Sequence, residues 1–426
     1  NLVNFLRGDR SNEGPDATTY YFQRTHVLGD IVDSQAAYVQ APSFGYADIG
    51  YAAFRSSNAS RQGMVYVGAN DGMLHAFDAS TGAEKWAYVP SMLLPNLYKL
   101  ADKNYASKHQ FFVDGSPQVA DVQFSDGWHT ILLGGLANGG RGYYALDVTT
   151  PAAPTVLWEF TNDTTKASPY ISDTDLGYSY GPPVVTKLSD GTWVALVTSG
   201  YNNVTDPTSG AGAGSGHGIL WVLNAQTGAI IKKIDTGSGS SASPSGLAQI
   251  GAYAPTNATT LYAYGGDLNG KLWRFDISQL KGDGTGTVAT QLLATLKDSS
   301  SPAQPQPITT APITGNSGGN ILVFVGTGQF LGLSDLSTTQ TPSIYAIKDP
   351  LEVTAAPLGT AVYANPRSNL CTVTSTTNCF VKNTLTDTGT ARAASSSIVA
   401  NFGTMDGWFA DLPETGERIN TEMNLQ

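Results

Sequence analysis

Residues 65–90 read VYVGANDGMLHAFDASTGAEKWAYVP and contain three short apolar runs separated by turn residues. The runs VYVGA, MLHAFDA and KWAYVP flank Asn70-Asp71-Gly72 and Ser80-Thr81-Gly82. Apolar residues that alternate with a period of two, between turns rich in Asn, Asp and Gly, are typical of neighbouring strands in an antiparallel meander. This stretch therefore predicts a β-sheet built from consecutive hairpins.

The same pattern, an aromatic-bearing strand that ends in Asp or Asn, recurs along the chain. The further copies are GYYALDVTTP (142–151), ILWVLNAQTG (219–228), KLWRFDISQL (271–280) and a weaker copy, SIYAIKDP (343–350). We take their anchors to be Asp78, Asp147, Asn224, Asp276 and Lys348. Four strands with their turns need about 40 to 50 residues, and the anchors lie further apart than that, so long insertions must fill the remainder.

These repeats predict an all-β fold, an irregular β-propeller, because one four-stranded sheet cannot bury both faces until neighbours stack beside it. A charged fraction of only 13% and 47 glycines agree with short strands and tight turns. We expect a lead-in segment at 1–26 and the propeller at 27–426. Five blades are visible, and segments 27–60 and 400–426 would supply two more, giving seven. The insertion at 95–110 predicts one short helix.

The charge and hydropathy of the chain exclude several classes of partner. A net charge of −11 disfavours nucleic acid, whose phosphates need clustered Lys and Arg. The sequence contains no run of about 18 apolar residues, and its amino end, NLVNFLRGDRSNEG, is polar. We therefore expect neither a membrane span nor a signal peptide, and a processed fragment is consistent with this.

Both cysteines lie in one Thr-rich stretch, NLCTVTSTTNCF, at Cys371 and Cys379. With no histidine nearby, we expect a disulfide in preference to a metal site. A disulfide argues for an oxidising, extracytoplasmic compartment.

Catalytic alternatives receive little support. The opening stretch resembles a blade of the propellers that bind a quinone cofactor in dehydrogenases, and such an enzyme is the principal alternative function. It would need a unique catalytic carboxylate, a calcium ion and an aromatic floor, and most such enzymes add adjacent cysteines, which this chain lacks. Its Asp and Trp residues instead recur once per repeat, which favours turn closure or wedging between blades. The five histidines show no zinc spacing, and we expect His75 to be packed and hydrogen-bonded.

Arg7-Gly8-Asp9 forms a cell-attachment tripeptide within FLRGDRSNEG. Such a motif works only where its cation and carboxylate splay apart at an exposed loop tip. Three further charges crowd it here, so a local salt-bridge or capping role is kept open beside receptor binding.

Several longer sequence segments resemble those of a known protein family. LRGDRSNE, HVLGDIVDS, DGMLHAFD, HQFFVDGSPQVADV, GGRGYYALDVT, DLGYSYGPPVV and GDLNGKLWRFD together resemble the carboxy-terminal propeller of the PilC/PilY family of type IV pilus tip adhesins. The resemblance implies an extracellular propeller at the pilus tip, seated on minor pilins, with roles in assembly, twitching motility and attachment. In that family a preceding domain carries much of the host or surface contact. Propeller scaffold lipoproteins of outer-membrane assembly machines share blade phrases and are a third possibility.

The resemblance also bears on calcium. Many family members carry an Asp-x-Asn-x-Asp-x-x-x-Asp loop just before the GDLNG strand, whereas residues 253–261 here read YAPTNATTL. Tyr253, Pro255 and Leu261 supply no carboxylate, and Asn257 alone is too weak for an ion that takes six to eight oxygens. We therefore expect no calcium at this loop and no other cofactor. Asp173, Asp175 and Asp206 could form a substitute site, but we expect them to be solvated loop acids.

Family members continue past a GERIN-like segment into a further strand pair, whereas this sequence stops at TEMNLQ. An open propeller leaves strand edges unpaired. We therefore expect the final strands to be missing from the sequence, or another chain to cover that edge.

Overall fold

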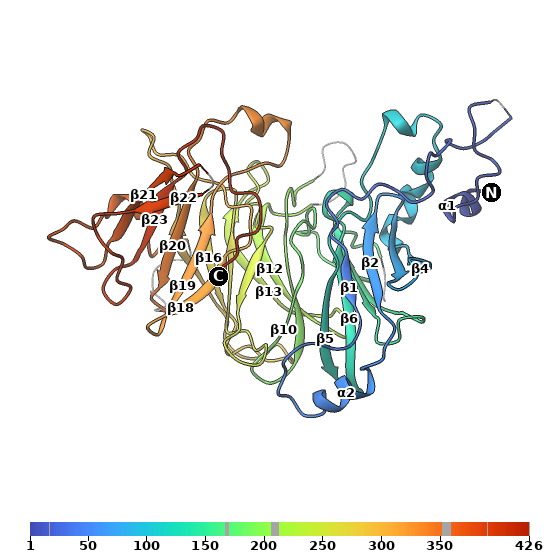
Figure 1. Cartoon of the computed structure of the whole chain (residues 1–426), viewed down its shortest axis with the longest axis horizontal. Coiled ribbons are helices and arrows are strands. Elements are labelled where there is room, and N and C mark those ends of the chain that lie inside the picture. Colours follow the sequence, from blue (N-terminus) through green and yellow to red (C-terminus); the bar gives the residue numbers. More distant parts are fainter. Residues whose placement is uncertain (17, 167–169, 206–212, 352–358, 390, 426) are drawn as a thin grey trace.

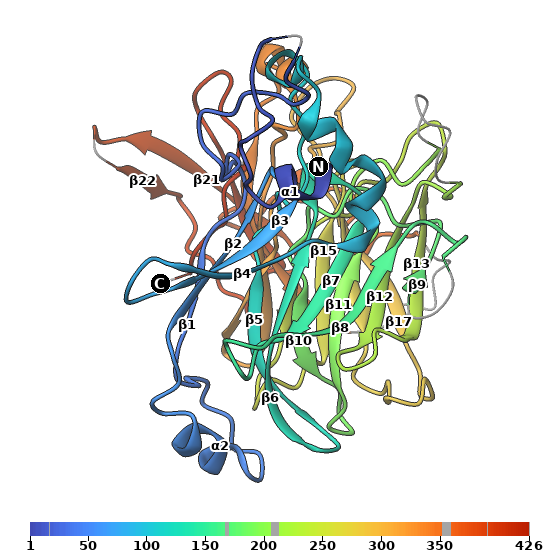
Figure 2. The same cartoon turned by 90° about the vertical axis from the view of Figure 1, so that its right-hand side faces the viewer.

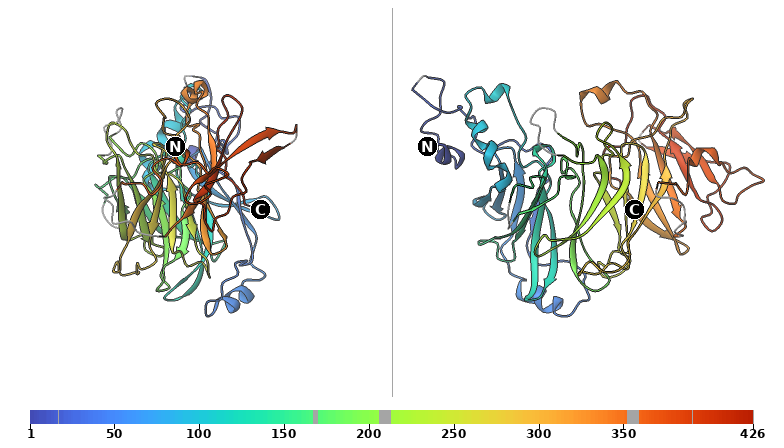
Figure 3. Two further views of the ribbon diagram at one scale, coloured as in Figure 1. Left: turned by 90° about the vertical axis from the view of Figure 1, so that its left-hand side faces the viewer. Right: turned by 180° about the vertical axis from the view of Figure 1, so that it is seen from behind.

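Five sheets follow one another in chain order and form an arc. The computed structural model describes residues 1–425 apart from 17, 167–169, 206–212, 352–358 and 390. The first strands of successive sheets contact one another, so the sheets radiate from a shared inner edge as propeller blades do. The first and fifth sheets lie at opposite ends of the longest axis (Figure 1), and the view from behind shows the same arc (Figure 3).

The first two sheets come from the amino-terminal part of the chain. Sheet one has the order β1 (Ala37–Val39), β2 (Met64–Ala69), β3 (Met73–Asp78) and β4 (Glu84–Tyr88). Sheet two runs through β5 (Gln118–Phe124), β6 (Gly127–Gly135), β7 (Gly142–Asp147) and β8 (Thr155–Thr161) to a parallel strand, β9 (Tyr170–Ser172). The opening stretch is therefore β2, β3 and β4, and the predicted meander is confirmed.

The remaining three sheets continue the arc. Sheet three comprises β10 (Val184–Lys187), β11 (Trp193–Thr198), β12 (His217–Asn224) and β13 (Ile230–Gly239), and sheet four comprises β14 (Ile250–Tyr253), β15 (Tyr262–Gly266), β16 (Lys271–Asp276) and β17 (Ala289–Thr295). Sheet five has the order β18 (Ile313–Ser317), β19 (Asn320–Gly326), β20 (Ser343–Asp349), β23 (Gly407–Asp411), β21 (Phe380–Asp387) and β22 (Arg392–Ser395). Strand β21 runs parallel to β23.

The two further blades expected from segments 27–60 and 400–426 do not form as separate sheets. Segment 27–60 supplies β1, the inner strand of sheet one, and 400–425 supplies β23, which pairs with β20 of sheet five. The described residues therefore form five sheets where seven were expected. Each of these two segments adds one strand to an existing sheet, because β1 pairs with β2 and β23 pairs with β20.

The helical content also differs from the single short helix that was expected. The 95–110 insertion forms 3-10 turns at Ser91–Ala101 and Tyr105–Ser107, and the buried leucines of the first turn pack against the sheets. Two α-helices, α1 (Leu2–Leu6) and α2 (Tyr51–Ser57), were not anticipated, because each is short and held mainly by a buried aromatic residue, Phe5 or Tyr51. Further 3-10 turns lie at Ala137–Gly139, Leu333–Ser337 and Pro366–Ser368.

The repeated polar anchors close turns. In each sheet the Oδ1 atom of the anchor accepts a hydrogen bond from the backbone N–H two residues later, at 2.8 to 3.0 Å. The anchors are Asp78, Asp147, Asn224, Asp276 and Asp349. The fifth anchor is thus Asp349 and not Lys348, because the carboxylate, and not the ammonium, can accept this bond.

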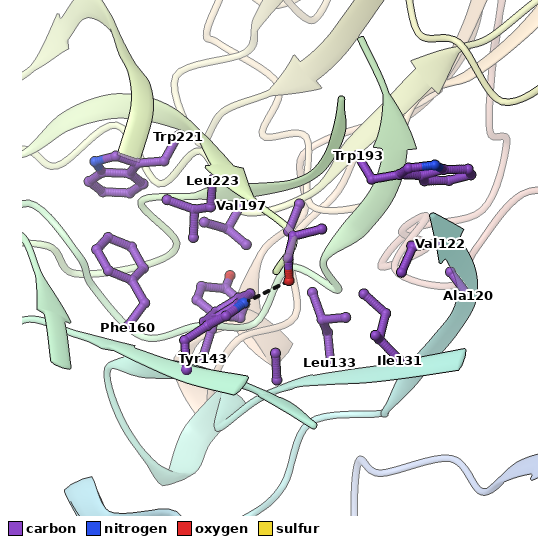
Figure 4. Packing of buried hydrophobic residues seen from close by; sticks show 14 of the residues in the cluster. Ala120, Val122, Ile131, Leu133, Tyr143, Phe160, Trp193, Val197, Trp221 and Leu223 are labelled. Carbon is purple, nitrogen blue, oxygen red and sulfur yellow. Dashed lines mark hydrogen bonds between the residues drawn. The ribbon is translucent and has the colours of Figure 1, made fainter. Parts of the chain in front are cut away.

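Tryptophans fill the spaces between neighbouring sheets. Trp86 Nε1 donates to the carbonyl of Pro151 at 2.8 Å, and Trp158 Nε1 donates to that of Ala225 at 2.9 Å. Each bond joins one sheet to the next. Figure 4 shows the apolar cluster between sheets two and three, where Trp193 and Trp221 pack with aliphatic residues of both. The indoles therefore act as wedges between blades.

Candidate functional site

Several long connections lie at the upper end of the sheets. This end carries the β2–β3 and β6–β7 turns and lies uppermost in Figure 1. Segment 29–34 crosses it: the carboxylate of Asp30 accepts from Asn70 Nδ2 at 2.9 Å and contacts His109 Nε2 at 3.0 Å. Gly29 N–H donates to Asp71 Oδ2 at 2.8 Å. The lead-in chain is therefore fastened to the first two sheets before it enters β1.

A buried carboxyl group lies under this segment. Asp114 is 1% exposed, and its Oδ1 accepts from the backbone N–H of Asp33 at 3.2 Å. Burial, together with the charge of the nearby Asp33 carboxylate, raises the pKa of Asp114 to about 6. Asp114 can therefore exchange a proton near neutral pH, but it has almost no access to solvent.

A cavity of about 860 Å³ opens at this end, and we call it the upper pocket. Its walls come from the 91–101 turn, the 136–141 turn and residues 161–166. It is lined by apolar, amide, hydroxyl and cationic side chains, including Met92, Asn96, Lys99, Phe111, Asn138, Arg141, Asn162, Asp163, Thr165, Lys166, Tyr170 and Tyr178.

Positive charge dominates the upper pocket. Among the described residues, Lys99, Arg141 and Lys166 line it together with one acid, Asp163. The guanidinium of Arg141 lies 5.5 Å from the Tyr178 ring centroid and donates to the carbonyl of Val204 at 2.9 Å. Hydrogen bonds from Thr165 lower the pKa of Asp163, so this acid is charged at neutral pH.

A second, smaller cavity of about 350 Å³ lies between the lead-in segment and sheet one. Its lining includes Phe5, Phe22 and Leu100, and the Arg24 guanidinium lies 3.9 Å from the Phe5 ring centroid. Arg24 also pairs with Glu13 at 2.6 Å. The Phe22 N–H donates to the carbonyl of Ala101 at 3.1 Å, and this bond ties residues 1–26 to the connection that follows sheet one.

The tripeptide Arg7-Gly8-Asp9 lies just after α1 with the Arg7 and Asp9 side chains exposed. The carboxylate of Asp9 accepts the Ser11 N–H at 2.8 Å, which lowers the pKa of Asp9. Gly8 has φ of 104°, a left-handed conformation that favours glycine. Asp9 therefore has a local capping role in this structure.

The loop expected to lack calcium is fastened by other contacts. Asn257 Oδ1 accepts the Ala47 N–H at 2.9 Å, and its Nδ2 donates to Asp48 at 2.7 Å. Asp48 also pairs with the Nζ of Lys187 at 2.5 Å, and the Lys187 side chain is 5% exposed. Tyr253 ends β14, whereas Pro255 and Leu261 lie in the loop. The Asn257 amide is thus already engaged within the protein.

The acids Asp173 and Asp175 are partly exposed, as loop acids would be, but both are also ion-paired, which was not expected. Lys233 Nζ lies 2.8 Å from Asp173 and 2.7 Å from Asp175, and Ser215 donates to Asp175 from both its N–H and its Oγ. Hydrogen bonds from Lys233 and Ser215 outweigh burial and lower the pKa of Asp175. Lys233 could not be assigned to these acids because it lies far from them in sequence. Asp206 falls outside the described residues.

Cys371 and Cys379 form a disulfide at the edge of sheet five. Among the described residues no group of three or more His, Cys, Asp and Glu side chains is placed to hold a metal ion. The imidazole of His75 lies between Glu84 (2.7 Å) and Asp71 (3.1 Å), so the expectation of a packed, hydrogen-bonded histidine agrees with its contacts.

The sequence did not predict the upper pocket. Its cations lie on three separate connections and share no motif. The available signal was that two long insertions, 95–110 and 161–177, each follow the fourth strand of a sheet. Successive connections of that kind lie at the same end of a propeller and so approach each other.

No helix in the described part of the chain is long and apolar enough to cross a membrane.

Comparison with known proteins shows the family. A family model described as the PilY1 beta-propeller domain matches residues 28–372. The type IV pilus biogenesis factor PilY1 of Pseudomonas aeruginosa strain PAK is 36% identical over 378 residues, which cover 82% of this chain and 30% of that protein. A PilY1 homolog of Xylella fastidiosa is 34% identical over 431 residues, covering 98% of this chain and 31% of that protein.

A solved structure agrees with these matches. The crystal structure of the P. aeruginosa PilY1 C-terminal domain aligns with a TM-score of 0.67 at 27% identity, covering 91% of this chain and 80% of that chain. The chain spans less than a third of the length of the two curated relatives. Since the family model covers most of its length, the chain belongs to the PilY1 β-propeller family, whose curated relatives are named type IV pilus biogenesis factors.

Proposed function

We propose that this chain is a non-enzymatic adhesin and assembly factor of the type IV pilus tip. Its propeller docks onto minor pilins, outside the cell, and supports attachment and twitching motility. A preceding domain of the whole protein would contact the host or abiotic surface. The observation that carries this proposal is the family match over residues 28–372, with relatives named for pilus biogenesis.

The outer rim of sheet five offers a docking surface for a minor pilin. Strand β22 pairs only with β21 among the described strands, and all four of its residues are exposed. The β21–β22 hairpin projects from the body of the protein (Figure 2). Val373 and Val399, which flank this hairpin in sequence, are 79% and 88% exposed. An open strand edge, with exposed apolar side chains close to it in sequence, suits pairing with a strand of another protein.

The repeated acids support the non-enzymatic part of the proposal. Asp78, Asp147 and Asp276 accept hydrogen bonds from their own turns, so their carboxylates are used structurally. A tightly bound quinone chromophore in the purified protein, with dye-linked alcohol oxidation, would instead identify a dehydrogenase.

Paired substitutions test the docking surface. Val373→Glu with Val399→Glu, in the full-length protein, should reduce surface pili and abolish co-purification of minor pilins. Ile49→Glu is the matched control, because Ile49 is 91% exposed and its carbonyl accepts from Trp128 of sheet two, a different blade from sheet five. Normal piliation and normal pilin recovery in the double variant would refute docking at this rim.

A further inference from the structure

The polar wall of the upper pocket lies mainly on connections between strands, whereas Leu93, Phe112 and Leu136 of its lining belong to the apolar core. The 91–101 turn and residues 161–166 lie in connections between strands, and neither segment extends the four-stranded core of its sheet. The floor is nevertheless fixed. Glu159, on β8 and 5% exposed, accepts from Ser91 Oγ at 2.6 Å, and Ser91 Oγ also contacts the Tyr170 hydroxyl at 3.0 Å. The pocket is therefore anchored to sheet two.

The size and the polar groups of the pocket fit a small organic ligand. A cavity of 860 Å³ lies within the range of about 300 to 1,000 Å³ typical of ligand sites. Amides of Asn96, Asn138 and Asn162 can both donate and accept hydrogen bonds, as vicinal hydroxyl groups require. The rings of Tyr170 and Tyr178 add flat apolar faces with a polar rim. Amides together with aromatic rings match a sugar, which has polar edges and apolar ring faces.

The positive charge of the pocket favours a negatively charged ligand. The chain as a whole carries −11, yet three of the four charged residues that line the pocket are cations. Within the part of the chain that the structure describes, the ammonium groups of Lys99 and Lys166 form no ion pair within 4.0 Å. A carboxylate on the ligand would supply the missing counter-charge and form charge-assisted hydrogen bonds.

We propose that the upper pocket binds an acidic oligosaccharide. The amides and tyrosine rings hold the sugar units, and Lys99 and Lys166 attract their carboxylates. This inference goes beyond the assembly role proposed above and does not depend on docking to pilins.

Calorimetric titration of the purified chain tests this inference. The probes are a trimer of galacturonic acid and its carboxyl-reduced, neutral counterpart. The acidic trimer should bind at least about tenfold more tightly, since a hydrogen bond to a charged group contributes about 1.5 to 3 kcal/mol. Equal affinities, or no binding of the acidic trimer, would overturn the proposal. Equal or tighter binding of an acidic peptide of the same charge would also overturn it.

Variants place the ligand in the pocket. Lys99→Ala with Lys166→Ala should weaken binding of the acidic trimer at least about tenfold and flatten its salt dependence. Lys281→Ala is the matched control, because Lys281 is exposed on the β16–β17 connection at the opposite end of the sheets. Melting curves should be unchanged, since Lys166 is exposed and Lys99 half-buried. Unchanged affinity in the folded double variant would refute the site, whatever the outcome for piliation.

Discussion

The guanidinium of Arg274 on β16 lies 2.5 Å from the carboxylate of Asp349 on β20, and both side chains are buried at the boundary between sheets four and five. The hydroxyl of Tyr264, on β15, donates to the other oxygen of Asp349 at 2.7 Å. Asp349 also closes its own turn through the Leu351 N–H. One carboxylate thus joins two blades and ends a strand.

Removing the cation should destabilise the protein strongly. Arg274→Met leaves the Asp349 carboxylate buried without its ion pair, so the free energy of unfolding should fall by about 3 to 5 kcal/mol. Chemical denaturation followed by tryptophan fluorescence measures this change.

Two comparisons separate charge from packing at this site. Arg274→Met with Asp349→Asn should recover part of the loss, because the amide is neutral and its oxygen can still accept the Leu351 N–H. Arg392→Met breaks an exposed pair with Glu417 and should change the free energy of unfolding far less. Equal losses in Arg274→Met and Arg392→Met would contradict this account.

The repeat pattern was sufficient to predict the second and third strands of each sheet but not how the terminal segments pair. The anchors Asp78, Asp147, Asn224 and Asp276 were visible because each follows an aromatic-bearing strand. The fifth copy is weaker, so Lys348 was chosen where the adjacent Asp349 accepts the turn hydrogen bond. A local sequence pattern predicts a strand but not the strand with which it pairs. The segments that contain β1 and β23 were therefore expected to form separate blades.

The candidate site was harder to predict for a related reason. Lys99, Arg141 and Lys166 belong to three connections that meet only when the sheets are stacked. The pairing of Lys233 with Asp173 and Asp175 likewise joins distant parts of the chain. Charged residues on loops follow no periodic pattern, so the sequence alone does not show which of them lie close together, and each is expected to be exposed to solvent.

His75 should make stability fall as the pH rises. Burial opposes protonation of its imidazole, but hydrogen bonds to Asp71 and Glu84 outweigh burial and raise its pKa above the ordinary value. The folded state therefore binds the proton more tightly than the unfolded state. This stabilisation is complete below about pH 6.5, the ordinary pKa of histidine, and is lost as the pH rises through the raised value.

Melting temperatures from pH 5.5 to 8.5 test this linkage. The protein with His75→Gln should show a flatter decline above pH 6.5 than the unsubstituted protein. His26→Gln is the control, because His26 is exposed and forms no ion pair with any described residue. Parallel pH profiles for all three proteins would mean that the His75 contacts do not favour the imidazolium.

Lys187 should hold the 254–261 loop without calcium. Its ammonium pairs with Asp48, and Asp48 in turn accepts from Asn257, so the protein's own cation neutralises the acid beside this loop. We expect the melting temperature to be the same in millimolar calcium and in excess chelator. Lys187→Met should lower the free energy of unfolding by about 2 kcal/mol, because Asp48 is partly exposed and water can compensate some of the lost pair. Lys281→Met, a substitution of an exposed lysine, should have little effect. A saturable rise in melting temperature with calcium, abolished by Asn257→Ala, would show that the loop binds the ion after all.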